Sequence, residues 1–141
     1  MHRQLVTAAA LLLVGTLPPG GRPAEARPSR DTDTRLVISK TLPRLNGEHL
    51  QVKVVEVSYG PGESSPAHSH PCAVIGYVVE GSYRTQVKGE AEVVYQAGQS
   101  FYEAPNGVHQ LSANASRDRP VKFTATFVCE SDIPVSGPPR P

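Results

Sequence analysis

The chain has 141 residues, and its 14 Lys and Arg residues against 13 Asp and Glu residues leave a formal charge of +1 at pH 7. A charge so close to zero provides no strong field for nucleic acid or an anionic membrane, so we expect neither as a partner. The length suits one domain with a modest core and argues against two domains with separate cores.

The N-terminal segment, residues 1–26, has the pattern of a secretory signal peptide. A basic start precedes an uncharged apolar run over residues 5–17, and Ala24 and Ala26 are small residues where a signal peptidase cuts. The apolar run is shorter than the roughly 20 residues that span a bilayer. We therefore predict cleavage near Ala26 and export to a periplasmic or extracellular location, with no stable membrane association afterwards.

The rest of the chain divides into a folded part with a polar segment on each side. Residues 27–34 are polar and lack periodicity, which predicts a flexible leader. Residues 131–141 are rich in proline, which cannot continue a hydrogen-bonded ladder, so a disordered tail is predicted there. The folded domain should occupy residues 35–130.

Within that domain the apolar residues recur with a period of two, in short segments separated by Gly, Pro and Asn. No amphipathic helix stands out, and a change of phase near Val54 predicts a β-bulge in the second strand. About eight short strands in fewer than about 100 residues predict an all-β sandwich or closed barrel. The predicted strands cover residues 36–39, 49–59, 74–80, 82–87, 92–95, 101–103, 108–112 and 121–129.

The triplet His68-Ser69-His70 is the most informative chemical feature. Residues two apart on an extended segment point to the same face, so both imidazoles could reach one ion. Imidazole is the commonest protein ligand for transition metals. The pair alone is a weak signal, because two solvated loop histidines would have the same spacing.

The residues around this triplet resemble the two sequence motifs of the cupin superfamily. The first motif is the stretch PGESSPAHSHPCAVIGYVVEG, in which Gly62 lies six residues before His68 and Gly81 lies eleven after His70. The second motif is Gly98-QSFYEAPNGV-His109. The resemblance covers about residues 47–130 and implies a single small antiparallel β-barrel, or double-sheet jelly roll.

The resemblance implies that His68, His70 and His109 bind one divalent metal ion. The glutamate that the family usually has four residues after the second histidine is absent, because Val74 stands there. The glycine of the second motif is displaced by one position and leaves Asn106 in its place. Asn tolerates a left-handed backbone, so the turn can be kept.

Three neutral imidazoles would leave the charge of a divalent ion uncompensated and a coordination position open to water or substrate. Such sites occur in cupin-like enzymes that bind iron(II) and dioxygen, and in zinc sites that activate water. The ion could be Fe(II), Zn, Mn, Ni or Cu. We predict a metal-dependent oxygenase that acts on a small molecule, with two alternatives: a non-catalytic cupin that binds or senses a small ligand, and a metal-dependent isomerase or lyase.

Four further residues have possible roles in or near the site. Glu103 could replace the missing carboxylate as a general base or as a partner of a ligand histidine, or it could be a solvated strand end. Cys72 has the parity of the two histidines and could be a soft ligand, although an inert buried thiol is the simpler expectation. A disulfide from Cys72 to Cys129 is a third possibility in an oxidising compartment. Tyr77 should pack outside the pocket, and resemblance alone suggests a homodimer.

Overall fold

The computed structural model describes residues 34–139. The predicted signal peptide and nearly all of the predicted leader therefore lie outside the described residues. The compact unit that begins at Arg35 contains the predicted domain. Its strands, as described, are β1 (Gln51–Tyr59), β2 (Ser64–Ser65), β3 (His68–Ser69), β4 (Ala73–Glu80), β5 (Ser82–Val87), β6 (Val93–Gln96), β7 (Ser100–Glu103), β8 (Val108–Asn114) and β9 (Val121–Cys129).

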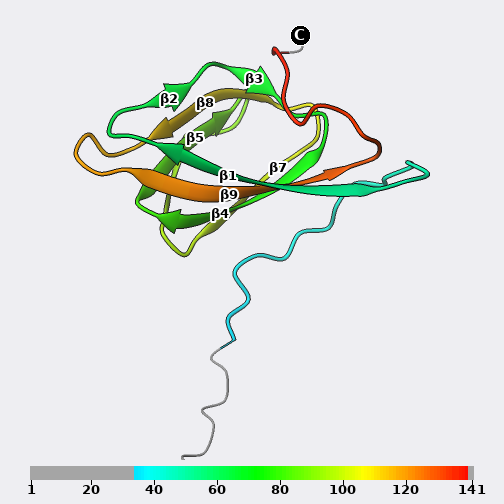
Figure 1. Ribbon diagram of the computed structural model, residues 1–141, viewed down its shortest axis with the longest axis horizontal. Helices are drawn as coiled ribbons and strands as arrows, with labels where there is room; N and C mark the ends of the chain where they lie inside the picture. The colour runs from blue at the N-terminus through cyan, green and yellow to red at the C-terminus, as the bar shows by residue number, and fades with distance from the viewer. Residues whose placement is uncertain (1–33, 140–141) are drawn as a thin grey trace, which may run out of the picture. The chain divides into compact units, whose positions relative to one another are not determined.

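These strands form two antiparallel sheets (Figure 1). One sheet has the order β1-β9-β4-β7, and the other has the order β2-β8-β5-β6, with β3 also paired to β8. No helix occurs between residues 34 and 139. The predicted all-β double-sheet barrel is confirmed. None of the described residues forms a helix long and apolar enough to cross a membrane.

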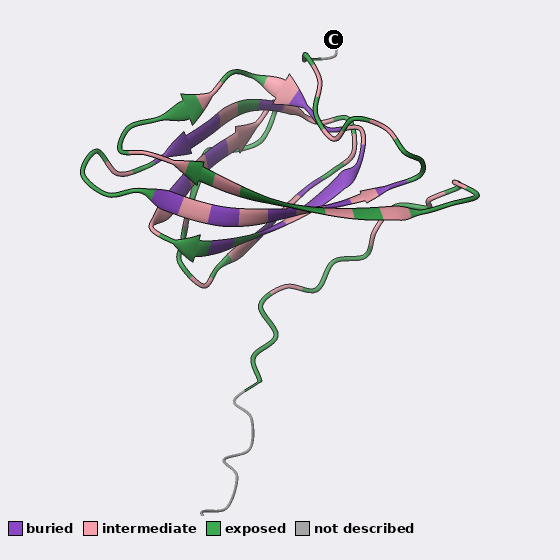
Figure 2. Cartoon of the chain, viewed as in Figure 1, coloured by how far each residue is buried: buried purple, intermediate pink, exposed green. Residues whose placement is uncertain are grey.

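The core lies between the inner faces of the two sheets. Strand β9 alternates buried and partly buried residues along its whole length, as the sequence pattern predicts (Figure 2). Its buried residues join two clusters, one around Val74 and Phe127 and the other around Tyr83 and Phe123. The second cluster contains residues from both sheets, so it holds the two layers together.

A glycine makes room for the aromatic part of this core. Gly76 on β4 lies directly opposite Phe101 on β7, and a β-carbon on Gly76 would overlap the Phe101 ring. The Phe101 ring packs 5.0 Å from Tyr83 and 5.9 Å from Phe123, measured between ring centroids. Gly76 is therefore a packing position, where the missing side chain lets an aromatic ring lie against the strand.

Two local predictions are wrong. Residues 36–39 form no strand. The predicted bulge near Val54 is absent, because β1 pairs with β9 in unbroken register from Gln51 to Tyr59. The apolar residues change phase because Val52 and Val54 lie on the outer face, at 66% and 65% exposure, whereas Val57 and Tyr59 pack against the core.

The two cysteines form a disulfide that joins the start of β4 to the end of β9. The Cα atoms of Cys72 and Cys129 are 4.7 Å apart, and both residues are buried in the cluster around Val74. The expectation of an inert buried thiol is therefore wrong. The pairing also excludes Cys72 as a thiolate ligand, because its sulfur is bonded to Cys129.

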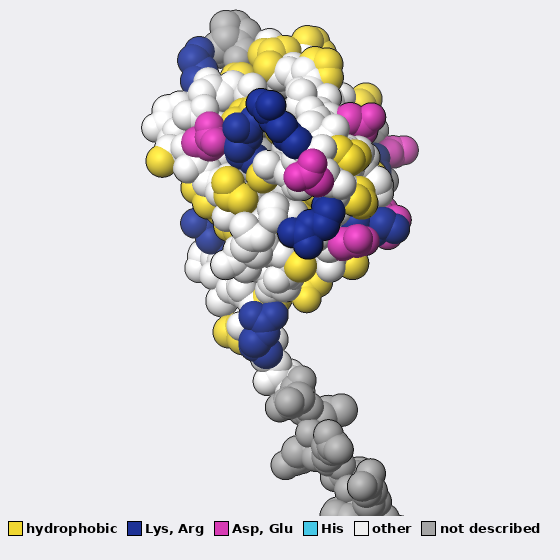
Figure 3. All heavy atoms as spheres, turned by 90° about the vertical axis from the view of Figure 1, so that its left-hand side faces the viewer, with side chains coloured by type: hydrophobic (Ala, Val, Ile, Leu, Met, Phe, Trp, Pro, Cys, Tyr) yellow, Lys and Arg dark blue, Asp and Glu magenta, His cyan; other side chains and the backbone are white. Residues whose placement is uncertain are grey.

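One face of the domain carries charged side chains of both signs. On the end of the barrel that Figure 3 shows, basic and acidic side chains are interspersed, and none of the described histidines is visible. This mixture agrees with the near-zero formal charge of the chain.

Replacing Gly76 with Ala should lower the free energy of unfolding by about 1–3 kcal/mol, because the new methyl group overlaps the Phe101 ring. Urea denaturation under non-reducing conditions measures this change. The matched control is Gly137→Ala, where a β-carbon meets no atom within 4 Å. Equal stability of the two variants would contradict the packing role of Gly76.

Candidate metal centre

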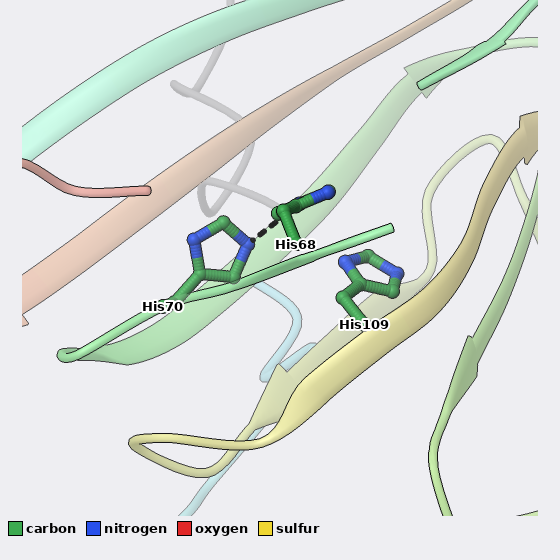
Figure 4. Close-up of side chains that lie close together, drawn as sticks. All are labelled: His68, His70 and His109. Atoms are coloured by element: carbon green, nitrogen blue, oxygen red, sulfur yellow. Dashed lines mark hydrogen bonds between the residues drawn. The ribbon is translucent and has the colours of Figure 1, made fainter. Parts of the chain in front are cut away.

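The pairing of β3 with β8 brings the predicted histidines together. His68 on β3 lies directly opposite His109 on β8, and cross-strand partners have their side chains on the same face. His70 follows β3 immediately and points into the same space (Figure 4). One nitrogen from each of the three rings lies within 4.8 Å of the others. The structure thus assembles the three residues that the sequence predicts as ligands.

A hydrogen bond fixes the far side of each ring. His68 Nδ1 donates to the Pro66 carbonyl at 2.8 Å, and His70 Nδ1 donates to the Val135 carbonyl at 2.7 Å. His109 Nε2 lies 2.6 Å from the Thr85 hydroxyl. Outward hydrogen bonds of this kind orient metal-binding imidazoles and select their tautomers.

The inner nitrogens of His68 and His70 face each other. A carbonyl can only accept, so each Nδ1 atom carries the hydrogen and, in a neutral ring, leaves Nε2 with a lone pair. The two Nε2 atoms are 3.1 Å apart (Figure 4). Two lone pairs at this distance repel each other unless a proton or another cation lies between them. The donor set therefore fits a bound metal ion.

The ring of His109 gives a second indication of a cation site. Its Nδ1 atom is buried and has no hydrogen-bond partner among the described residues. Burial lowers the pKa of His109 to about 4, with a smaller contribution from His68 and His70. Burial also lowers the pKa of His70. Both rings are thus poor proton acceptors at neutral pH and keep lone pairs free for a metal.

Glu103 lies beside the histidines and is not a solvated strand end. It is 6% exposed on β7, with its carboxylate 3.6 Å from His70 Nε2 and 3.5 Å from His109 Nδ1. Burial, with a smaller contribution from the negative charge of Glu90, raises the pKa of Glu103 to about 7. The site therefore contains a carboxyl group that could bind a cation or hold a proton near neutral pH.

Several residues that support the site were not predicted from the sequence. A chain of hydroxyl groups runs from His109 through Tyr83 and Ser112 to Tyr59, with contacts of 3.3, 2.9 and 2.9 Å. Burial raises the pKa of Tyr83, so its hydroxyl stays protonated. The alternation of Tyr83 and Thr85 on the inner face of β5 is a signal that could have identified both.

The site opens from a small cavity into a larger groove. The inner cavity has a volume of about 70 Å³ and is bounded by the three histidines, Glu103 and mainly apolar residues. The outer groove has a volume of about 470 Å³. Val57, Tyr59, His68, His70 and Phe127 line both spaces, so they form the passage between them. A ligand in the groove could reach the imidazoles through this passage.

The C-terminal segment makes one wall of the groove. Residues 131–141 are predicted to be a disordered tail, whereas in the structure Ser69 and Gly137 exchange two backbone hydrogen bonds of 2.9 and 3.0 Å. Lys53 Nζ also donates to Asp132 at 2.8 Å, and Ile133 and Val135 pack against the core. The apolar residues between the prolines account for this attachment, since they bury surface against the barrel.

Three other residues considered in the sequence can be placed in the structure. Asn106 has a φ of 65°, so it adopts the left-handed conformation that the second motif needs. Tyr77 lies on the outer face, as predicted, and His49 is exposed and outside the site.

Comparisons with known proteins give the same fold. A model of the cupin domain matches residues 55–128. A cupin-like protein from Thermotoga maritima superposes with a TM-score of 0.49 at 26% identity, over 54% of this chain and 56% of that one. A variant of oxalate decarboxylase from Bacillus subtilis superposes with a TM-score of 0.52 at 24% identity, over 62% of this chain and 23% of that one. The DMSP lyase DddQ from Ruegeria pomeroyi superposes with a TM-score of 0.52 at 17% identity, over 64% of this chain and 45% of that one.

This chain spans about half, or less, of the length of these three proteins. A search of curated proteins gives no match. At these identities, the likeness to the decarboxylase and the lyase shows the fold alone.

Replacing Thr85 with Val should weaken zinc binding by about 10- to 100-fold, because the His109 ring loses the hydroxyl that orients it. Competition with a chromophoric chelator measures this affinity. The same change at Thr124, which is partly buried and outside the cavity lining, should leave the affinity unchanged. If the Thr85→Val variant bound zinc as tightly as the unmodified protein, Thr85 would have no orienting role.

Proposed function

The chain belongs to the cupin family, and we propose that it is a metal-dependent enzyme of the oxygenase type. Its substrate is a small molecule that binds beside His68, His70 and His109. One observation carries the proposal: the inner nitrogens of these three rings meet within 4.8 Å, while a hydrogen bond holds the far side of each ring. This arrangement prepares a site for a cation before the cation binds.

The residues fit a divalent ion better than a shared proton. His68 and His70 would supply Nε2, and His109 would supply its buried Nδ1 atom. A bound divalent ion polarises an oxygen of a chelating ligand and, as iron(II), supplies electrons for reaction with dioxygen. Imidazole sites accept several divalent metals, so Fe(II), Zn, Mn, Ni and Cu are all candidates.

The shapes of the two spaces favour a particular class of substrate. The inner cavity of about 70 Å³ has room for a small polar group but not for a whole metabolite. The groove of about 470 Å³ is lined mainly by apolar side chains, among them Val55, Val57 and Phe127. We propose a substrate with an oxygen-rich chelating end, which enters the cavity, and an apolar or aromatic body, which lies in the groove.

The chain's own residues would position such a substrate and limit the entry of water. The Phe127 ring lies 5.1 Å from that of His70 and forms part of the passage, so a bound apolar group would pack against it. The Tyr59 hydroxyl is bonded to Ser112 at 2.9 Å and faces both spaces, where it could donate to a substrate oxygen. With the groove filled, the cavity would be closed to bulk water.

We also propose that the protein is exported and works in an oxidising compartment. The Cys72–Cys129 disulfide supports this location, since such bonds persist in secreted and periplasmic proteins. The signal-peptide pattern of residues 1–26 supports it independently.

The metal requirement is tested by measuring metal content after expression and dialysis. We expect close to one divalent ion per chain, and at least about a tenfold loss in the double variant His68→Ala/His109→Ala, which lacks two ligands. The control is His49→Ala, because His49 is exposed and outside the site. A folded protein without metal, or equal loss in both variants, would contradict the proposed site.

The reaction type is tested by oxygen uptake after anaerobic loading with iron(II). Aromatic 1,2-diols and 2-hydroxybenzoates are suitable probes, since each has a chelating end and an apolar body. We expect uptake with at least one probe in the unmodified protein and none in the double variant. Metal binding without uptake would overturn the oxygenase assignment and favour a binding protein, or a lyase or isomerase.

Export is tested by the intact mass of the protein recovered from the medium or periplasm of its host. We expect the mass of residues 27–141, reduced by two hydrogens because Cys72 and Cys129 are joined. Reduction and alkylation should then label two thiols. A full-length chain that stays in the cytoplasm with two free thiols would contradict the proposal.

A further inference from the structure

We propose that Glu103 is a fourth metal ligand, supplied by β7 at the strand position opposite Val74. This inference rests on the proposed metal site of His68, His70 and His109. Glu103 would then bind the ion directly. The sequence alone predicted a general base, a hydrogen-bond partner of a ligand histidine, or a solvated strand end.

The contacts of the carboxylate fit a bound cation. Its two oxygens lie next to His70 Nε2 and His109 Nδ1, at 3.6 and 3.5 Å. Glu103 is 6% exposed, so water can replace little of the hydration that its carboxylate loses on burial. Because His70 uses Nδ1 to donate to Val135, its Nε2 atom presents a lone pair toward the negative oxygen. Two electron-rich atoms in a buried site are stabilised by a cation that both can bind.

Three contacts have the lengths expected between ligands of one ion, whereas the widest separation among the three ring nitrogens, at most 4.8 Å, would shorten when an ion binds. Ligands bound at about 2.0–2.2 Å lie roughly 3.0–3.5 Å from their neighbours in tetrahedral or octahedral geometry. The contact between His68 Nε2 and His70 Nε2 is 3.1 Å, and the two contacts of Glu103 are close to the upper end of that range. The same contacts of Glu103 are too long for strong hydrogen bonds to the rings.

The sheet register explains how the carboxylate reaches the site. Val74 on β4 pairs directly with Glu103 on β7, so the two side chains lie on the same inner face. Both residues line the inner cavity with the three histidines. Val74 occupies the position where the first motif lacks its acidic residue, and Glu103 offers a carboxylate from the neighbouring strand. A change of strand therefore preserves an acidic group on this wall of the cavity.

A carboxylate ligand would also change the charge of the site. Three neutral imidazoles and a divalent ion carry +2, whereas the added carboxylate lowers this to +1. A singly charged anionic group of a substrate would then bring the centre to neutrality. This favours substrates that chelate through one ionised oxygen, such as a phenolate or a monocarboxylate.

The test compares Glu103→Gln with Glu80→Gln in the full chain. Glu103→Gln keeps the size of the side chain and removes its charge, and we expect zinc affinity to fall at least about tenfold in competition with a chromophoric chelator. Glu80→Gln removes an exposed charge at the end of β4 that lines neither the cavity nor the groove, so its affinity should stay within about twofold of the unmodified protein. Thermal unfolding of the metal-free proteins checks that both variants fold.

A third variant moves the carboxylate from β7 to the paired position on β4. Val74→Glu/Glu103→Val should recover most of the zinc affinity lost in Glu103→Gln, because the acidic group lies on the same cavity wall. The visible spectrum of bound cobalt(II) reports the ligands directly, and it should change in Glu103→Gln.

The outcomes separate this inference from the proposed function. Unchanged affinity and an unchanged cobalt spectrum in Glu103→Gln would overturn the ligand role and leave the three-histidine site intact. Weaker binding with an unchanged cobalt spectrum would also overturn it, since Glu103 would then act through its charge alone. Absence of metal binding in the unmodified protein would overturn both proposals.

Discussion

The candidate centre depends on the three hydrogen bonds that hold the far sides of the histidine rings. Pro66, Val135 and Thr85 each fix one ring, so the remaining nitrogens must face one another. The resulting 3.1 Å contact between His68 and His70 is unfavourable for two neutral rings and favourable around a cation. These hydrogen bonds thus favour metal binding, because they restrict the orientation of each ring.

The rest of the fold places these partners. Pairing of β3 with β8 sets His68 opposite His109, and pairing of β4 with β7 brings Glu103 to the facing sheet. The C-terminal segment adds the Val135 carbonyl and one wall of the groove. The Cys72–Cys129 disulfide joins β4 to β9, two residues beyond His70. The orientation of the His70 ring therefore depends on residues that are far from it in sequence.

Local patterns in the sequence were enough to predict the β-class and the three histidines. The spacing of His68 and His70 fixes their common face, and the alternation along residues 121–129 fixes a core strand. Burial of Glu103, the disulfide and the attached C-terminal segment depend on contacts between distant strands, which local patterns do not reveal. The phase change near Val54 led to the wrong prediction of a β-bulge, because a strand at the edge of a sheet can have apolar residues on both faces.

The most direct test is a crystal structure of the zinc-loaded protein with anomalous scattering measured at the zinc edge. The account predicts one ion per chain, bound at about 2.0–2.2 Å to His68 Nε2, His70 Nε2 and His109 Nδ1. An anomalous peak elsewhere, or none between these rings in fully loaded crystals, would contradict it.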